Sequence, residues 1–217
     1  MTKNSFSILI AILLALFAIS ASIAVPICVR PFYYAHIEGL HMPETTGWTH
    51  EQIKEAFDDV MDFLLKGTEF RTGDLAWSES GKSHFADCKF LFHLDLRIFA
   101  LSGIALLVIL LLCKNKKTQP ARLAGRGPSF WAAIGMIALF GGFGAFMASD
   151  FDRAFTVFHK IFFPGKTNWV FNPNTDQIIR VMPETFFRNC AILIGALLAV
   201  FVIVYLIAGR KRQTKGL

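Results

Sequence analysis

Two histidines outside the apolar stretches of the sequence are the residues best suited to chemistry. Asp87 follows His84 by three positions, a helical spacing at which a carboxylate can orient an imidazole as a general base. His159 lies among phenylalanines at helical spacing, four residues after Phe155. Each feature also has a structural interpretation, with His84 and Asp87 as a surface or capping pair and His159 as an interfacial residue. The spacing alone does not show that the two histidines meet.

Cys88 lies one helical turn after His84, the spacing of a cysteine nucleophile and its base. A cysteine on an apolar helix is more often a small core residue, and we favour that interpretation. The four cysteines include no C-x-x-C pair, which argues against a zinc site and a dithiol shuttle. A single disulfide among Cys28, Cys88 and Cys190 stays open.

The signatures of several common enzyme classes are missing from the sequence. It contains no G-x-S-x-G elbow, no H-E-x-x-H, no Walker loop and no G-x-G-x-x-G. An enzyme built on this chain would therefore work by positioning and acid–base catalysis. We predict neither a metal nor a cofactor.

Four apolar stretches must position these residues. Only 18% of the 217 residues are charged and 54% are hydrophobic, whereas a soluble domain carries about 25% charged residues. About 20 apolar residues cross a bilayer, and the predicted spans are residues 6–29, 94–113, 129–148 and 188–208. The first stretch also resembles a signal peptide, but its apolar run continues to Val29, so we favour a retained helix.

Basic residues predict the orientation of the spans. The linker 114–128 carries five Lys or Arg residues and the tail after residue 208 carries four, both without an acid. Because loops rich in Lys and Arg stay in the cytoplasm, we expect the linker and both termini there. Segments 30–93 and 149–187 then face outward. The net charge of +6 is a topology signal, and nucleic acid is not an expected partner.

The two outer segments are predicted to be mostly helical. Thr49 and Gln52 have the spacing of a capping box before an amphipathic stretch. Ser78–Gly81 is interpreted as a turn. Helices are expected over residues 49–65, from Lys82 into the second span, over 151–163 and over 177–182. The fold class is therefore an all-α membrane protein: four transmembrane helices and a small, mostly helical extracytoplasmic cap, in one integral membrane domain spanning 1–217.

Four stretches of the sequence resemble one protein family closely. They are Ser83–Lys89, Phe158–Phe163, Trp169–Ile179 and Met182–Phe187. The family is the bacterial lipoprotein intramolecular transacylase, a four-span integral membrane protein, and the resemblance covers essentially the whole chain in order.

The resemblance implies an enzyme of the cell membrane with its active site on the outer face. Its substrate would be a lipoprotein whose N-terminal cysteine carries a diacylglyceryl thioether, so that lipoprotein and membrane lipid are the implied partners. One acyl chain would move from the glyceryl ester to the α-amino group of the same cysteine, giving the lyso-form. The two histidines of the family fall on His84 and His159, with support implied for Asp87, Trp169, Pro173 and Asp176.

Two questions stay open at this stage. We hypothesise that His84, oriented by Asp87, removes the proton of the amine, whose reference pKa is about 8, while His159 stabilises the oxyanion; the reverse assignment is also compatible. The competing hypothesis is a non-catalytic membrane subunit whose outer cap binds a partner protein. It predicts that both histidines are dispensable and that the helix over residues 49–65 is essential.

Overall fold

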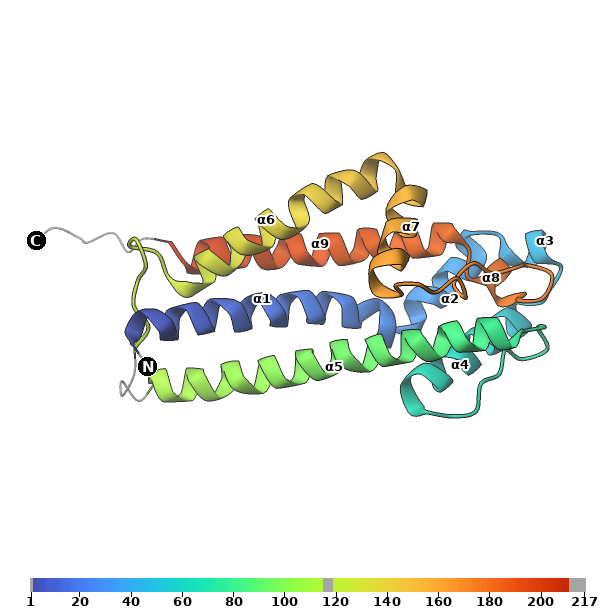
Figure 1. Ribbon diagram of the computed structural model, residues 1–217, viewed down its shortest axis with the longest axis horizontal. Coiled ribbons are helices and arrows are strands. Elements are labelled where there is room, and N and C mark those ends of the chain that lie inside the picture. Colours follow the sequence, from blue (N-terminus) through green and yellow to red (C-terminus); the bar gives the residue numbers. More distant parts are fainter. Residues whose placement is uncertain (1, 115–118, 211–217) are drawn as a thin grey trace, which may run out of the picture. The chain divides into compact units, whose positions relative to one another are not determined.

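The chain is helical throughout most of the residues that the computed structural model describes, which are 2–114 and 119–210. Within these ranges, β-structure is limited to two isolated bridges. Figure 1 shows the helices in chain order: α1 Lys3–Cys28, α2 Arg30–Gly39, α3 Met42–Thr46, α4 His50–Lys66, α5 Glu79–Lys114, α6 Pro128–Ser149, α7 Phe151–Phe162, α8 Ile178–Val181 and α9 Glu184–Ala208. The predicted all-α fold is confirmed.

Four of these helices, α1, α5, α6 and α9, are long and apolar enough to cross a membrane, which confirms the predicted number of spans. Helix α5 has 36 residues, so at 1.5 Å per residue it is about 54 Å long, well beyond the roughly 30 Å of a hydrocarbon layer. Apart from Lys114 at its end, all its charged residues precede Ile98. The second part of α5 therefore forms the span, and the part with His84 precedes it.

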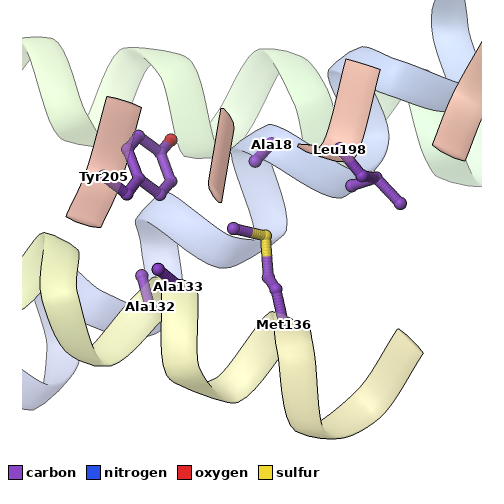
Figure 2. Close-up of a cluster of buried hydrophobic side chains, with 6 residues drawn as sticks. All are labelled: Ala18, Ala132, Ala133, Met136, Leu198 and Tyr205. Atoms are coloured by element: carbon purple, nitrogen blue, oxygen red, sulfur yellow. The ribbon is translucent and has the colours of Figure 1, made fainter. Parts of the chain in front are cut away.

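The chain divides into two compact units, of which the first contains Met1–Ile23, Leu96–Ser149 and Ile194–Leu217. Small residues let helices approach closely in lipid. Figure 2 shows the buried cluster that α1, α6 and α9 share in this unit: Ala18, Ala132, Ala133, Met136, Leu198 and Tyr205. The hydroxyl of Tyr205 donates a hydrogen bond to the carbonyl oxygen of Leu14 at 3.1 Å. Several basic residues used for the topology prediction lie outside the described residues, namely Lys116, Lys117, Lys211, Arg212 and Lys215.

The second compact unit contains Ala24–Asp95 and Asp150–Leu193. The predicted capping box is present, because Thr49 and Gln52 exchange hydrogen bonds at the start of α4. One face of α4 is buried: Ile53, Phe57, Val60, Met61 and Leu64. Tyr33 of α2 stacks on Phe57 with ring centroids 3.6 Å apart and donates its hydroxyl to the carbonyl oxygen of Val181 at 2.6 Å. Helices α2, α4 and α8 thus share the core of this unit.

Helix α5 begins earlier than the sequence predicted. The turn expected at Ser78–Gly81 is wrong, because Glu79–Gly81 are the first three residues of the helix. The hydroxyl of Ser78 accepts a hydrogen bond from the backbone N–H of Gly81 at 3.0 Å, which is the arrangement of a helix N-cap. Glycine suggested a turn, but here its missing Cβ leaves room for the carboxylate of Asp176.

Candidate active site

The structure brings His84 of α5 and His159 of α7 together within the second unit. Their ring centroids are 5.7 Å apart and their planes meet at 36°. The side chains are buried, with His84 5% and His159 6% exposed. The spacing in the sequence could not show this meeting, because it depends on how α5 and α7 pack.

The tautomer of His159 follows from its backbone contact. Its Nδ1 lies 2.8 Å from the carbonyl oxygen of Phe155, one turn earlier in α7. A carbonyl oxygen only accepts hydrogen bonds, so Nδ1 carries the hydrogen and Nε2 carries the lone pair. Burial lowers the pKa of His159 below its usual value near 6.5. The ring is therefore neutral at pH 7, with Nε2 available as a base.

His84 makes a different set of contacts. Its Nε2 lies 3.3 Å from the sulfur of Cys88, and its Nδ1 is buried without a hydrogen-bond partner in the described part of the chain. Burial, together with the nearby His159, lowers the pKa of His84 to about 4. At neutral pH the site thus holds two uncharged imidazoles.

Aromatic rings surround the two imidazoles. The ring of Phe163 lies 5.0 Å from that of His84 and 5.7 Å from that of His159. Phe171 lies 5.5 Å from His84, and Trp169 lies 4.8 Å from His159, all measured between ring centroids. Such walls exclude water, which strengthens every electrostatic interaction inside them. Trp169, for which the resemblance implied a supporting role, thus contacts His159 directly.

Asp87 pairs with side chains other than His84, which the sequence had predicted it to orient. Its carboxylate forms an ion pair with Lys166 at 2.5 Å and accepts a hydrogen bond from the side-chain amide of Asn168 at 3.0 Å. Among the described residues no hydrogen bond joins Asp87 to His84. Burial alone would raise the pKa of Asp87, but Lys166 and Asn168 outweigh it and lower that pKa. Asp87 therefore ties the segment after α7 to α5 and leaves His84 to another partner.

Asp176 attaches the second outer segment to the beginning of α5. Its carboxylate accepts hydrogen bonds from the backbone N–H of Ser78 at 2.9 Å and from the Ser78 hydroxyl at 2.7 Å. Beside this contact, Ala76 and Gln177 exchange two more hydrogen bonds, at 2.8 and 2.9 Å. Pro173 is exposed in the turn that precedes Asp176. Asp176 therefore contacts Ser78, which lies six residues before His84 in the sequence. This contact is structural.

A groove of about 250 Å³ reaches the site through Phe163, although neither histidine lines it. It is mostly apolar, with one charged pair in its lining: Asp87, Phe90, Leu91, Phe162, Phe163, Pro164 and Lys166. Its residues come from α5 and from the end of α7 and the turn after it. The groove and the site share Phe163, which contacts both histidines.

Several residues of the site were not predicted from the sequence, or were assigned a different role. Phe163, Phe171, Lys166 and Asn168 carry no local signal, since their contacts arise only when the two segments meet. Cys88 had a signal, its position four residues after His84. Burial raises the pKa of Cys88 to about 12, so it remains a thiol and is unsuited to nucleophilic attack.

Two further expectations concern cysteines and metals. All four cysteines are free, so the disulfide that the sequence left open is not formed. Across residues 2–114 and 119–210, no group of three or more His, Cys, Asp or Glu side chains is placed to hold a metal ion.

Comparison with known proteins gives matches of two kinds. The family described as lipoprotein intramolecular transacylase Lit matches residues 8–187. No curated protein matches the chain. Among solved structures, the chain is similar to the membrane-integral lipoprotein intramolecular transacylase Lit from Bacillus cereus, with a TM-score of 0.80 and 23% identity over 93% of this chain and 91% of that chain.

Two variants of the Bacillus cereus enzyme, each with one histidine replaced, have the same fold. The variant with arginine gives a TM-score of 0.74 at 22% identity, covering 93% of this chain and 88% of that chain. The variant with alanine gives 0.66 at 23% identity, covering 93% and 89%. The match to the family extends over most of the sequence and replaces the hypothesis of a non-catalytic subunit. The chain belongs to the lipoprotein intramolecular transacylase family, Lit, and is a membrane-integral acyltransferase.

Proposed function

We propose that this protein moves one acyl chain of a diacylglyceryl-modified lipoprotein from the glyceryl ester to the α-amine of the N-terminal cysteine, with His84 and His159 as its catalytic residues. The observation that carries this assignment is the pair of buried imidazoles with centroids 5.7 Å apart. Each ring keeps one nitrogen, Nδ1 of His84 and Nε2 of His159, without a hydrogen-bond partner among the described residues.

The reaction is an isomerisation of the substrate. A bond forms between the α-amino nitrogen and the ester carbonyl carbon, and the bond from that carbon to the glycerol oxygen breaks. The proton lost by nitrogen ends on the glycerol oxygen, so no water or second substrate is consumed. Because both groups belong to one molecule, holding them in contact can lower the barrier by several kcal/mol.

The geometry favours His159 as the residue that moves the proton. Its Nδ1 hydrogen bond to Phe155 holds the ring in place and leaves the Nε2 lone pair available. That nitrogen takes the proton from the amine and delivers it to the departing glycerol oxygen. His84 is then the donor that stabilises the tetrahedral oxyanion. This is the reverse of our first hypothesis, which relied on a contact between Asp87 and His84.

The apolar groove is suited to the acyl chain that moves. The ester must lie at the imidazoles, and the groove begins beside them at Phe163. Its aromatic and aliphatic lining from α5 and α7 offers a chain an environment like that of the bilayer. The implied ligands are thus lipid and lipoprotein.

We also propose that both termini are cytoplasmic and that the active site faces outward. The support is the distribution of charge along the sequence. The linker 114–128 contains five Lys or Arg residues and no Asp or Glu, as is typical of cytoplasmic loops. A lipoprotein substrate displayed on the outer leaflet then meets His84 and His159 directly.

Tandem mass spectrometry on the N-terminal lipopeptide of a co-expressed reporter lipoprotein tests this function. The transfer conserves mass, so the fragments must place one chain on nitrogen and one on glycerol. We expect this product with the wild-type protein and its loss with His84→Ala and with His159→Ala, at equal expression. Cys190→Ala, a change in α9 at a residue without a described contact to either imidazole, is the matched control and keeps the product. Activity within a few-fold of wild type for either histidine variant would contradict the assignment.

A further inference from the structure

Cys88 supplies the only described hydrogen-bond contact of His84. The sulfur lies 3.3 Å from Nε2, and no other described group contacts a ring nitrogen of His84, since Nδ1 is unpartnered. His84 is only 5% exposed, so little bulk solvent reaches the ring. Among the described residues, the contact that can select the tautomer of this ring is therefore the one with Cys88.

The hydrogen of this contact belongs to sulfur. Burial raises the pKa of the Cys88 thiol to about 12, so the S–H is intact at neutral pH. A thiol sulfur is a poor acceptor, whereas an unprotonated imidazole nitrogen is a good one. The favourable arrangement is S–H donating to Nε2, which requires the ring hydrogen to be on Nδ1.

We propose that Cys88 is a positioning residue that holds His84 in its Nδ1–H tautomer and so makes Nδ1–H the donor to the oxyanion. This inference rests on the proposed function. A buried donor without an acceptor is costly and calls for an explanation. The developing oxyanion of the substrate is the acceptor that this site lacks in its free state. Because Nδ1 is buried, side chains around His84 must move for the ester to reach it.

The tautomer can be measured without substrate. The full-length protein is labelled with ¹⁵N at its histidine rings and reconstituted in phosphatidylglycerol nanodiscs, and the His84 signals are those missing from His84→Gln. Nitrogen shifts separate protonated from unprotonated ring nitrogens. We expect protonated Nδ1 and unprotonated Nε2 in the wild type and in Cys88→Ser, whose hydroxyl also donates. Cys88→Ala should shift the population toward Nε2–H, because no donor then faces Nε2.

The rate of acyl transfer on a synthetic diacylglyceryl lipopeptide gives the second readout. Since a hydrogen bond of this kind shifts an equilibrium by up to about tenfold, Cys88→Ala should lose kcat by up to that factor with little change in KM. Cys88→Ser should recover most of the loss, and Cys190→Ala, which removes a sulfur from α9, should lose nothing.

Two outcomes would overturn the proposal. One is Nε2–H in the wild-type spectrum, and the other is an unchanged tautomer and rate in Cys88→Ala. Failure of the proposed function is a separate result, because the wild-type protein would then produce no N-acyl lipopeptide whatever tautomer its spectrum shows.

Discussion

Asp176 receives both the backbone N–H and the hydroxyl hydrogen of Ser78, at 2.9 and 2.7 Å. Ser78 in turn caps α5 through the N–H of Gly81. A carboxylate at this end of a helix also interacts favourably with the helix dipole. One buried acid thus determines where α5 begins and holds the segment that carries Trp169 and Phe171 against it. The site depends on this contact although Asp176 touches neither imidazole.

Asp176→Ala should therefore lower both stability and activity. The change leaves the N–H and hydroxyl of Ser78 without their buried acceptor, which we expect to cost about 2–3 kcal/mol in the free energy of unfolding. Thermal unfolding in detergent measures the loss, and transferase assays should show a parallel decrease. Asp176→Asn keeps one acceptor oxygen and should lose less. A melting temperature of Asp176→Ala equal to that of the wild type would contradict this role.

Gly81→Ala tests the same contact from the helix side. A Cβ at Gly81 would overlap the Asp176 carboxylate and lie 3.0 Å from the Phe171 ring. We expect lower stability and a loss of transfer activity, even though alanine favours helix formation by about 1 kcal/mol. Gly39→Ala is the matched control, because nothing lies within 4 Å of its added Cβ. If both variants melt and react alike, the close approach is not a constraint.

Asp87→Asn should have a modest effect on catalysis. Asp87 binds Lys166 and Asn168 and not His84, and partly exposed ion pairs contribute at most about 1 kcal/mol. We expect kcat/KM to fall by less than about tenfold, against at least about 100-fold for His159→Ala, which would remove the proposed base. Steady-state rates on the same lipopeptide make the comparison. An equally severe loss in Asp87→Asn would restore Asp87 as the partner of His84.

The pH dependence follows from the two lowered histidine pKa values. Burial keeps both rings neutral at pH 7, with the pKa of His84 at about 4 and that of His159 below 6.5. As the pH falls from 8, the substrate amine, with a reference pKa of about 8, takes up a proton first, so kcat/KM should fall by up to about tenfold per pH unit. A second decrease should follow at lower pH, as His159 gains its proton. A twofold steeper slope already at pH 7 would show that a histidine titrates there.

Local patterns in the sequence predicted the helical fold well. The apolar spans, the capping box at Thr49 and the end of α7 before Pro164 are all local signals, and each is found in the structure. The predicted start of α5 was wrong because the helix cap is completed by Asp176, nearly a hundred positions away along the chain. Local propensity at Gly81 indicates a turn, and only the tertiary contact reverses it.

The sequence named candidate residues for the site but not the contacts between them. The resemblance to the family selected His84 and His159, and the structure adds their proximity. The sequence could not show that Asp87 pairs with Lys166, because a spacing of three residues between His84 and Asp87 is compatible with either partner. Nor could it show that Cys88 is the residue beside Nε2. Such choices are made between neighbouring side chains after the helices have packed.

A crossover experiment on the purified protein tests the proposed intramolecular transfer most directly. An equal mixture of two lipopeptides is used, one with deuterated acyl chains and one with a ¹³C-labelled peptide, and fragment ions locate every chain. We expect each peptide to acquire on nitrogen only a chain from its own glycerol, and His159→Ala to yield no N-acyl peptide. N-acyl peptides carrying the other molecule's chain, or chains that all remain on glycerol in the presence of folded wild-type protein, would contradict the proposed function.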